Sequence, residues 1–273
     1  MEIQNYDKYL MYFKTVQGSA LKSLTEALKE VLFETNIHFD SEGLKIMGMD
    51  PSQISIVLLK LNAVDFNEYY CPNPQVLGVN MIGLHKLLKT IGNNDTVAWY
   101  LLKDDPDKLG IHIQNKKKRI DNHIMFNLMN VDFFELEFPE DDPDVTITMP
   151  CGEFQKYCRE LVNVSKFVEI SVDPEGTFIM KADGDFAKQE VKIRESEESN
   201  TTIQLSDKEF SKDMGRFSLK FLNLFCKSST IGNTIQLYVG HEYPIFIVYR
   251  VASLGTCTYC LFPSVAKNDE TDI

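Results

Sequence analysis

The stretch GSALKSLTEALKEVLF, residues 18–33, decides the fold because the chain repeats its pattern in GEFQKYCRELV, residues 152–162. Apolar side chains recur at three and four residues in the first segment: Leu21, Leu24, Leu28 and Leu32. The second segment has the same spacing, with Phe154, Tyr157 or Cys158, and Leu161. Both patterns predict amphipathic helices. The segments begin 134 residues apart, which indicates two copies of one domain, because solenoid repeats are only about 20 to 50 residues long.

Other segments repeat in the same order. Gly43 and Gly176 lie 133 residues apart in expected hairpin turns. Residues 81–102 and 218–239 each predict a short helix followed by an alternating strand. We therefore expect an α+β chain of two sheet-rich domains, each with two short helices on antiparallel sheet. The expected boundaries are 1–127 and 145–273, joined by an acidic connector over 128–144.

The composition is that of a globular protein, with 44% apolar residues and a net charge of −12. No apolar run approaches the ~20 residues of a membrane-spanning helix, and the N-terminus has no secretory signal pattern. A reducing compartment is expected. The cysteines are spread through apolar segments and are interpreted as free thiols: Cys71, Cys151, Cys158, Cys226, Cys257 and Cys260.

Positive charge is concentrated on the four expected helices, over residues 18–33, 81–91, 152–162 and 218–228. Each carries two basic residues: Lys22, Lys29, Lys86, Lys89, Lys156, Arg159, Lys220 and Lys227. With four glutamates the helices sum to +4, so the rest of the chain sums to −16. A single helix with solvated lysines is common, but four alike favour a positive strip for phosphates within an otherwise acidic protein.

Several segments resemble the proliferating-cell nuclear antigen type of sliding DNA clamp. They are VQGSALKSLTEALKE (16–30), EGLKIMGMDPSQISIVLLKL (42–61), LGVNMIGLHKLLK (77–89), MPCGEFQKYCREL (149–161) and YPIFIVYRVASLGTCTYCLFP (243–263). The resemblance implies the DNA clamp fold, with three identical subunits closing into a ring around duplex DNA. It places the same eight basic residues on helices that line the channel. It also implies ring contacts near 118–126 and 187–193.

The resemblance further implies a hydrophobic pocket for short peptide motifs of DNA polymerase, clamp loader, flap endonuclease and DNA ligase. The matching positions are Met49, Gln53, Ile54, Leu136, Phe138, Pro244, Cys260, Leu261 and Phe262. Cys260 stands where eukaryotic clamps usually have Tyr, and Phe262 stands where they have a small residue. The loop at 172–175 lacks their ubiquitin-accepting lysine. These departures, and the residues through Tyr12 that precede the resemblance, are compatible with a large DNA virus or a divergent eukaryote. The expected location is the nucleus or a viral replication compartment.

No cofactor or metal is expected. Cys257 and Cys260 form a CxxC without a second ligand pair, and the histidines form no HExxH. Neither GxxxxGK[ST] nor GxGxxG occurs. Asp183 and Asp185 are interpreted as turn residues. The basic run at residues 116–119, Lys-Lys-Lys-Arg, is left open between a nuclear localisation signal, an extra DNA contact and a lysine-rich turn.

The leading hypothesis is a non-enzymatic processivity factor, which holds DNA by topology and slides on phosphate contacts. The first alternative is a subunit of a heteromeric checkpoint-type clamp that acts as an interaction module. The second is an enzyme that uses the region around Asp183 and Asp185.

Overall fold

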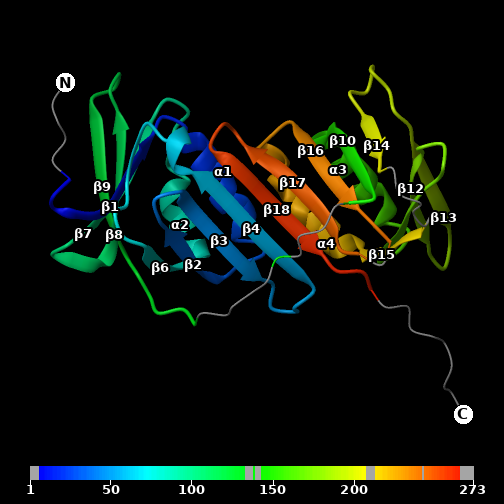
Figure 1. The fold of residues 1–273 in the computed structure, drawn as a ribbon, viewed down its shortest axis with the longest axis horizontal. Coiled ribbons are helices and arrows are strands. Elements are labelled where there is room, and N and C mark those ends of the chain that lie inside the picture. The colour runs from blue at the N-terminus through cyan, green and yellow to red at the C-terminus, as the bar shows by residue number, and fades with distance from the viewer. Residues whose placement is uncertain (1–5, 133–137, 139–142, 207–212, 242, 265–273) are drawn as a thin grey trace, which may run out of the picture. The chain divides into compact units, whose positions relative to one another are not determined.

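The computed structural model describes residues 6–132, 138, 143–206, 213–241 and 243–264. The chain divides into two compact units (Figure 1). Unit 1 comprises residues 1–138 and 250–258, and unit 2 comprises residues 139–249 and 259–273. Among the described residues, no helix is long and apolar enough to cross a membrane.

Unit 1 is built from antiparallel strands and two helices. Its elements are β1 (Tyr9–Thr15), α1 (Gly18–Leu28), β2 (Glu34–Phe39), β3 (Gly43–Met49), β4 (Ser55–Asn62), the 3₁₀ turn η1 (Ala63–Asp65), β5 (Glu68–Tyr70), β6 (Gln75–Asn80), α2 (Met81–Leu88), β7 (Thr96–Leu102), β8 (Asp105–Asn115) and β9 (Ile120–Asn127). One sheet has the order β5-β1-β7-β8-β9, and β4, β3, β2 and β6 are neighbours in another.

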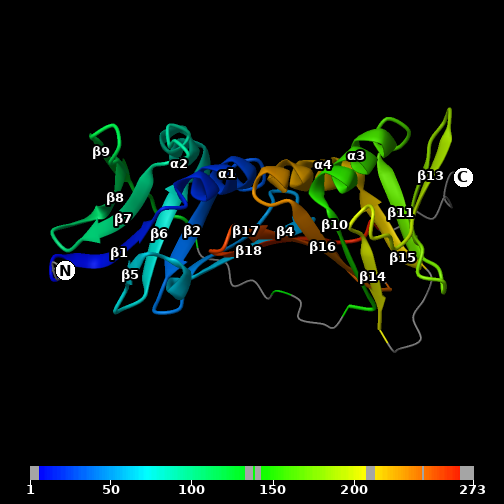
Figure 2. The same cartoon turned by 90° about the horizontal axis from the view of Figure 1, so that it is seen from above.

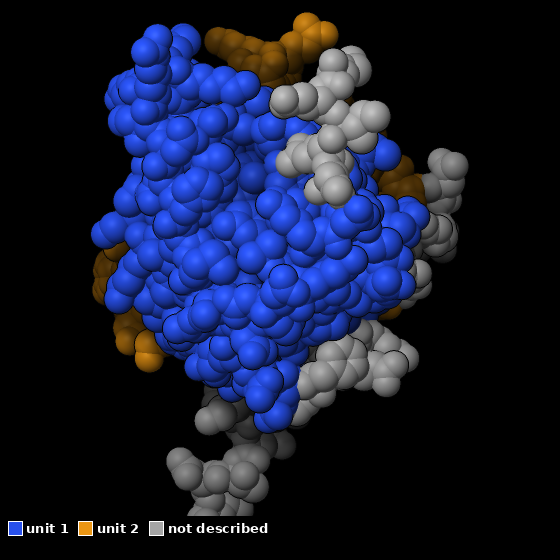
Figure 3. Space-filling model, turned by 90° about the vertical axis from the view of Figure 1, so that its left-hand side faces the viewer, with its two compact units in different colours: residues 1–138, 250–258 blue, residues 139–249, 259–273 orange. Residues whose placement is uncertain are grey.

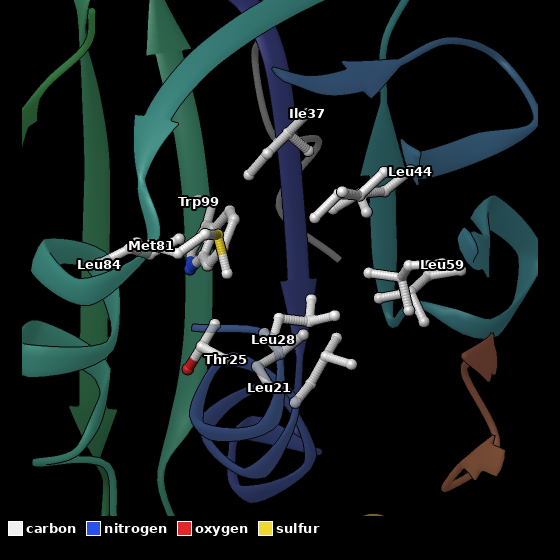
Figure 4. Close-up of a pocket in the computed structure, with 12 residues that line it drawn as sticks. Leu21, Thr25, Leu28, Ile37, Leu44, Leu59, Met81, Leu84 and Trp99 are labelled. Atoms are coloured by element: carbon white, nitrogen blue, oxygen red, sulfur yellow. The ribbon is translucent and has the colours of Figure 1, made fainter. Parts of the chain in front are cut away.

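The apolar stripe of α1 forms the core of unit 1. Leu21, Leu24 and Leu28 are buried. They line a small cavity of about 20 Å³ together with Ile37, Leu44, Leu59 and other apolar side chains of the strands (Figure 4). Each fully buried leucine contributes about 1.5–3 kcal/mol relative to an exposed one. The predicted stripe therefore fixes which face of α1 turns inward and which remains for solvent.

Unit 2 repeats this plan. Its elements are β10 (Val145–Pro150), α3 (Cys151–Leu161), β11 (Phe167–Val172), β12 (Phe178–Asp183), β13 (Lys188–Ile193), β14 (Thr202–Leu205), β15 (Asp213–Ser218), α4 (Leu219–Phe225), the 3₁₀ turn η2 (Cys226–Thr230), β16 (Thr234–Val239), β17 (Ile245–Val251) and β18 (Gly255–Leu261). Residues 250–258, at the β17–β18 turn, belong to unit 1. The neighbour orders are β13-β12-β11-β15 and β14-β10-β16-β17. In each unit the two helices lie on one face of the strands (Figure 2).

The predicted strands are present, and both glycine turns are confirmed. Gly43 and Gly176 have φ angles of 143° and 79°, which a residue with a Cβ rarely adopts. A Cβ on Gly43 would also lie 2.0 Å from the carbonyl oxygen of Leu61. Both positions therefore require glycine.

Three helices are shorter than predicted. α1 ends at Leu28 instead of Phe33, because the chain turns there to begin β2 at Glu34. α2 ends at Leu88 instead of Ile91. α4 ends at Phe225 and continues as η2, where the buried Ser228 Oγ lies 2.6 Å from the hydroxyl of Tyr259. Lys29 and Lys89 thus occupy helix C-caps, and Lys227 lies in a 3₁₀ turn.

All six cysteines are buried and none forms a disulfide bond within the described part of the chain, as predicted. The expected ring-contact segments at 118–126 and 187–193 include β9 and β13, and each strand is the last one of its sheet in this chain. Most of the acidic connector, residues 133–137 and 139–142, lies outside the described residues.

Candidate nucleic-acid interface

A side-chain contact joins helices α1 and α2 in unit 1. The Thr25 hydroxyl on α1 lies 3.4 Å from Nδ1 of His85 on α2. The side chain of Asn80 caps α2 by accepting a hydrogen bond of 2.8 Å from the backbone N–H of Gly83, which satisfies an N-terminal donor that the helix cannot pair itself. These contacts hold the backbone of the two helices that carry the basic side chains.

The four predicted cations of unit 1 differ in exposure. Lys86 and Lys89 are exposed, whereas Lys22 and Lys29 are half-buried. Nζ of Lys22 donates to the backbone oxygen of Ile91 at 3.4 Å, and Nζ of Lys29 lies 3.2 Å from a Glu30 carboxylate oxygen. The two cations of α1 therefore contact their own unit, whereas the two cations of α2 are exposed.

His85 on α2 lies near several of these cations. Burial lowers the pKa of His85 below 6.5, and the charge of Lys29 lowers it further. Lys89 and Lys22 act in the same direction, and Glu26 opposes them. Three of the four predicted cations thus act on one imidazole, so they share a single region of the unit 1 surface.

Helices α3 and α4 are locked together in unit 2 by side-chain amides. Nε2 of Gln155 donates to the backbone oxygen of Cys226 at 3.1 Å, and Nδ2 of Asn223 donates to that of Cys158 at 3.0 Å. The predicted cations beside these residues are all exposed: Lys156, Arg159, Lys220 and Lys227. Unit 2 therefore presents four accessible charges on one braced helix pair.

The arrangement of charge in both units suits phosphate groups. Each unit holds four basic residues on its two helices or directly after them, and the helices lie at one face of the strands (Figure 2), in a chain whose net charge is −12. Exposed lysines and arginines bind the nucleic-acid backbone without reading sequence.

A groove of about 770 Å³ in unit 1 includes part of the predicted peptide pocket. Its lining includes Met49 and Gln53 from that prediction. The carboxylate of Asp50 shapes this end, because it accepts hydrogen bonds from the backbone N–H groups of Ser52, Ile54 and Ser55 at 2.8, 2.8 and 2.6 Å. Gln53 has a φ of 57°, which is a left-handed backbone conformation within this turn.

The groove also has polar residues that the sequence prediction missed, including Asn36, His38 and Lys45. Nδ2 of Asn36 donates to the backbone oxygen of Val131 at 3.1 Å, which holds the start of the connector against β2. The alternation in ETNIHF, residues 34–39, indicated that Asn36 and His38 share the face opposite the core. Nothing in that pattern indicated that the chain returns to this face at Val131.

The remaining predicted pocket residues are distributed over both units. Ile54 and Phe138 in unit 1 and Phe262 in unit 2 are half-buried, whereas Pro244, Cys260 and Leu261 in unit 2 are buried. Burial raises the pKa of Cys260 to about 12. Leu136 lies outside the described residues. Met49, Gln53, Ile54, Phe138 and Phe262 are therefore the members of the predicted set whose side chains reach solvent.

The other candidate sites of the sequence analysis were a metal site and the acidic pair Asp183 and Asp185. Among the described residues, no group of three or more His, Cys, Asp or Glu side chains could hold a metal ion. Asp183 ends β12 and forms an ion pair of 2.6 Å with Lys188, and Asp185 follows in the turn between β12 and β13. The turn interpretation is confirmed for Asp185, whereas Asp183 is the last residue of β12 and pairs with Lys188 of β13.

The outer strands carry exposed apolar side chains. Ile120 and Met125 on β9 are 53% and 43% exposed, and Phe186, just before β13, is 79% exposed. β9 lies at the side of unit 1 that Figure 3 turns toward the viewer. Unpaired strand edges with apolar side chains are templates for pairing with another chain.

Two family models match the chain over most of its length. The N-terminal domain of proliferating cell nuclear antigen matches residues 10–136, and the C-terminal domain matches residues 137–264. The chain is also 33% identical over 264 residues to a protein of Paramecium bursaria Chlorella virus 1 named "Probable DNA polymerase sliding clamp 1". That similarity covers 94% of this chain and 98% of the viral protein.

Proposed function

Because the chain belongs to the proliferating cell nuclear antigen family and is a sliding clamp, we propose that three copies close into a ring around duplex DNA. β9 of one copy pairs with β13 of the next. The proposal rests on the positions of β9 and β13. Each is the last strand of its sheet within one chain. A contact between two different surfaces closes into a ring only at a suitable rotation, and DNA inside a closed ring is held without tight binding.

The inner surface of this ring carries the basic helix residues. Lys22, Lys29, Lys86, Lys89, Lys156, Arg159, Lys220 and Lys227 contact phosphates one at a time. Such contacts are weak and exchange readily, because exposed ion pairs are each worth only about 0–1 kcal/mol. Weak contacts let the clamp slide, whereas base-specific contacts would hold it at one sequence.

The unit 1 groove binds a short peptide of the replicative DNA polymerase. Met49 and Gln53 line it, and Ile54 of the same unit extends the proposed site. Peptides of the clamp loader, flap endonuclease and DNA ligase compete for the same groove. The clamp acts as a scaffold without catalysis of its own, in the nucleus or in a viral replication compartment.

Sedimentation equilibrium of the full chain tests the ring. At micromolar concentration the expected mass is three times 31.3 kDa. Ile120→Asp, at a β9 residue that is 53% exposed, should yield the single-chain mass, and Val64→Asp, at a residue that is 90% exposed in η1, should leave the trimer intact. A single-chain mass for the unmodified protein would contradict a homomeric ring and support the mixed checkpoint-type ring.

Calorimetry with a peptide from the cognate polymerase tests the groove. Met49→Ala should weaken binding by about 1–3 kcal/mol, the usual cost of truncating an interface anchor. Val64→Ala is the matched control, since Val64 is an exposed apolar residue of the same unit that does not line the groove. Equal affinity for the Met49→Ala variant and the unmodified protein would remove the groove from the proposal.

A further inference from the structure

The turn between β8 and β9 holds the only four consecutive basic residues in the chain: Lys116, Lys117, Lys118 and Arg119, here called the basic turn. All four are exposed. None of them forms an ion pair with a carboxylate in the described part of the chain. Four adjacent like charges repel one another within the ~10 Å screening length of dilute salt, so an anionic ligand would relieve that repulsion.

The basic turn has a defined backbone conformation. Asn115 pairs with Ile120 at the end of the β8–β9 ladder. The side-chain oxygen of Asn115 accepts a hydrogen bond of 2.9 Å from the backbone N–H of Lys118, and Arg119 takes a left-handed conformation with φ of 54°. The four cations therefore project from a closed hairpin turn.

A chain of hydrogen bonds ties the basic turn to the end of α2. Nδ2 of Asn115 donates to Oδ1 of Asp95 at 2.6 Å. The other oxygen of Asp95 accepts from the backbone N–H of Gly92 at 2.8 Å. Gly92 follows Ile91, whose carbonyl oxygen accepts from Nζ of Lys22 on α1 at 3.4 Å. The basic turn is thus anchored beside Lys22 and the C-terminal end of α2, where Lys89 lies.

The nearby carboxylates are engaged away from the basic turn. Asp95 is held by Asn115 and Gly92, as described. Oδ1 of Asp121 lies 2.9 Å from Nε2 of His112 and accepts from Nε2 of Gln114 at 2.9 Å. The hydrogen bonds from His112 and Gln114 lower the pKa of Asp121, so this carboxylate stays ionised and paired with the sheet.

From this geometry we infer that the basic turn is a second phosphate-binding element of the clamp, continuous with the helix cations of unit 1. Its ligand is the sugar-phosphate backbone of duplex DNA. The inference rests on the proposed DNA-binding role of the helices. In Figure 2 the β8–β9 turn reaches the same side of its sheet as α2, so a backbone that contacts Lys86 and Lys89 passes the basic turn as well. The turn would add DNA contacts beside β9, the strand proposed to join subunits.

The test measures equilibrium binding of the assembled protein to a fluorescent duplex over a series of salt concentrations. Lys117→Gln combined with Lys118→Gln removes two charges from the turn. The matched control is Lys60→Gln combined with Lys103→Gln, two exposed lysines of unit 1 that lie on no helix and do not line the groove. Thermal unfolding of both variants checks that neither fold changes.

The expected result is a shallower salt dependence for the turn variant. The slope of log K against log salt should fall by about 0.9 for each phosphate that the complex no longer neutralises, with weaker binding at low salt. The control pair should change the slope less. An unchanged slope for the turn variant, or an equal change in the control, would overturn the inference.

A third variant separates this inference from the proposed function. Lys86→Gln combined with Lys89→Gln removes two helix cations of unit 1. If this variant loses slope and the turn variant does not, the helix proposal stands and the turn inference fails. If neither variant loses slope, both fail. Full DNA binding by the turn variant with loss of nuclear import of a fused reporter would identify the turn as a localisation signal and would overturn the inference.

Discussion

Units 1 and 2 share an architecture but present positive charge differently. In unit 2 the cations of α3 and α4 are exposed. In unit 1 the two cations of α1 are half-buried, with Lys22 bonded to the Ile91 carbonyl and Lys29 paired with Glu30. The basic turn adds four exposed charges to the unit in which α1 has only half-buried cations.

This difference separates the number of charges on a surface from their availability to a ligand. Both helix pairs carry four cations, yet a lysine that already has a partner must leave that partner before it binds a phosphate. A duplicated domain can therefore keep its charge count while its two copies contribute unequally. The comparison predicts an order of effects on DNA binding, with the exposed pair on α3 first.

Lys156→Ala combined with Arg159→Ala should have the largest effect. Both side chains are exposed on α3, so the slope of log K against log salt should fall by about 0.9 for each phosphate that is no longer neutralised. Monomer stability should stay within about 0.5 kcal/mol, as is usual for surface substitutions. Fluorescence anisotropy with a duplex across salt concentrations measures the first effect, and thermal unfolding measures the second.

Lys22→Ala combined with Lys29→Ala should have a smaller effect on the same slope. These side chains are half-buried and already contact Ile91 and Glu30, so fewer counterions are released when DNA binds. Anisotropy under identical conditions gives the comparison. A slope change equal to or larger than that of the α3 pair would show that the intrachain contacts do not limit binding.

The smallest effect should be a shift in the pKa of His85. Lys29→Ala should raise it toward 6.5, because the charge of Lys29 is the largest electrostatic contribution that lowers it. NMR titration of the imidazole measures the shift, and Lys220→Ala in unit 2 serves as the control. An unmoved pKa in Lys29→Ala would show that the field between α1 and α2 does not come from Lys29.

The same histidine gives stability a pH dependence. Because the pKa of His85 is lower in the folded chain than 6.5, the unfolded chain binds more protons in the window between the two values. The contribution of neutral His85 to stability is therefore present above pH 6.5 and is lost as the pH falls through the folded pKa. Denaturant unfolding of the unmodified protein and His85→Gln across this window should show the difference.

The periodic segments made much of the fold predictable. The leucine spacing in residues 18–33 identified the buried face of α1, and the repeat 134 residues later identified the second domain. The alternating segments identified the strands. The basic residues were found from helical spacing because exposed charges repeat opposite the apolar stripe.

Helix ends and long-range contacts were not predictable in the same way. Periodicity continued past Leu28, but the buried turn before β2 ends the helix there. The half-burial of Lys22 depends on the position of Ile91, which is 69 residues away in sequence. The groove beside Met49 depends on the return of the chain at Val131. A local sequence pattern contains no information on contacts between residues that are distant in sequence.

We propose that duplex DNA lies against the helix faces of both units. Photo-cross-linking can locate the DNA, with a photoreactive residue placed at Lys86 on α2, at Lys220 on α4, or at Lys60 on β4, in clamps loaded on circular duplex DNA. Lys60 is exposed on the strand face opposite the buried Leu59 and Leu61 and does not line the groove. We expect DNA cross-links from positions 86 and 220 and none from position 60. Cross-links from position 60 without any from 86 and 220 would show that the DNA does not lie against the helices.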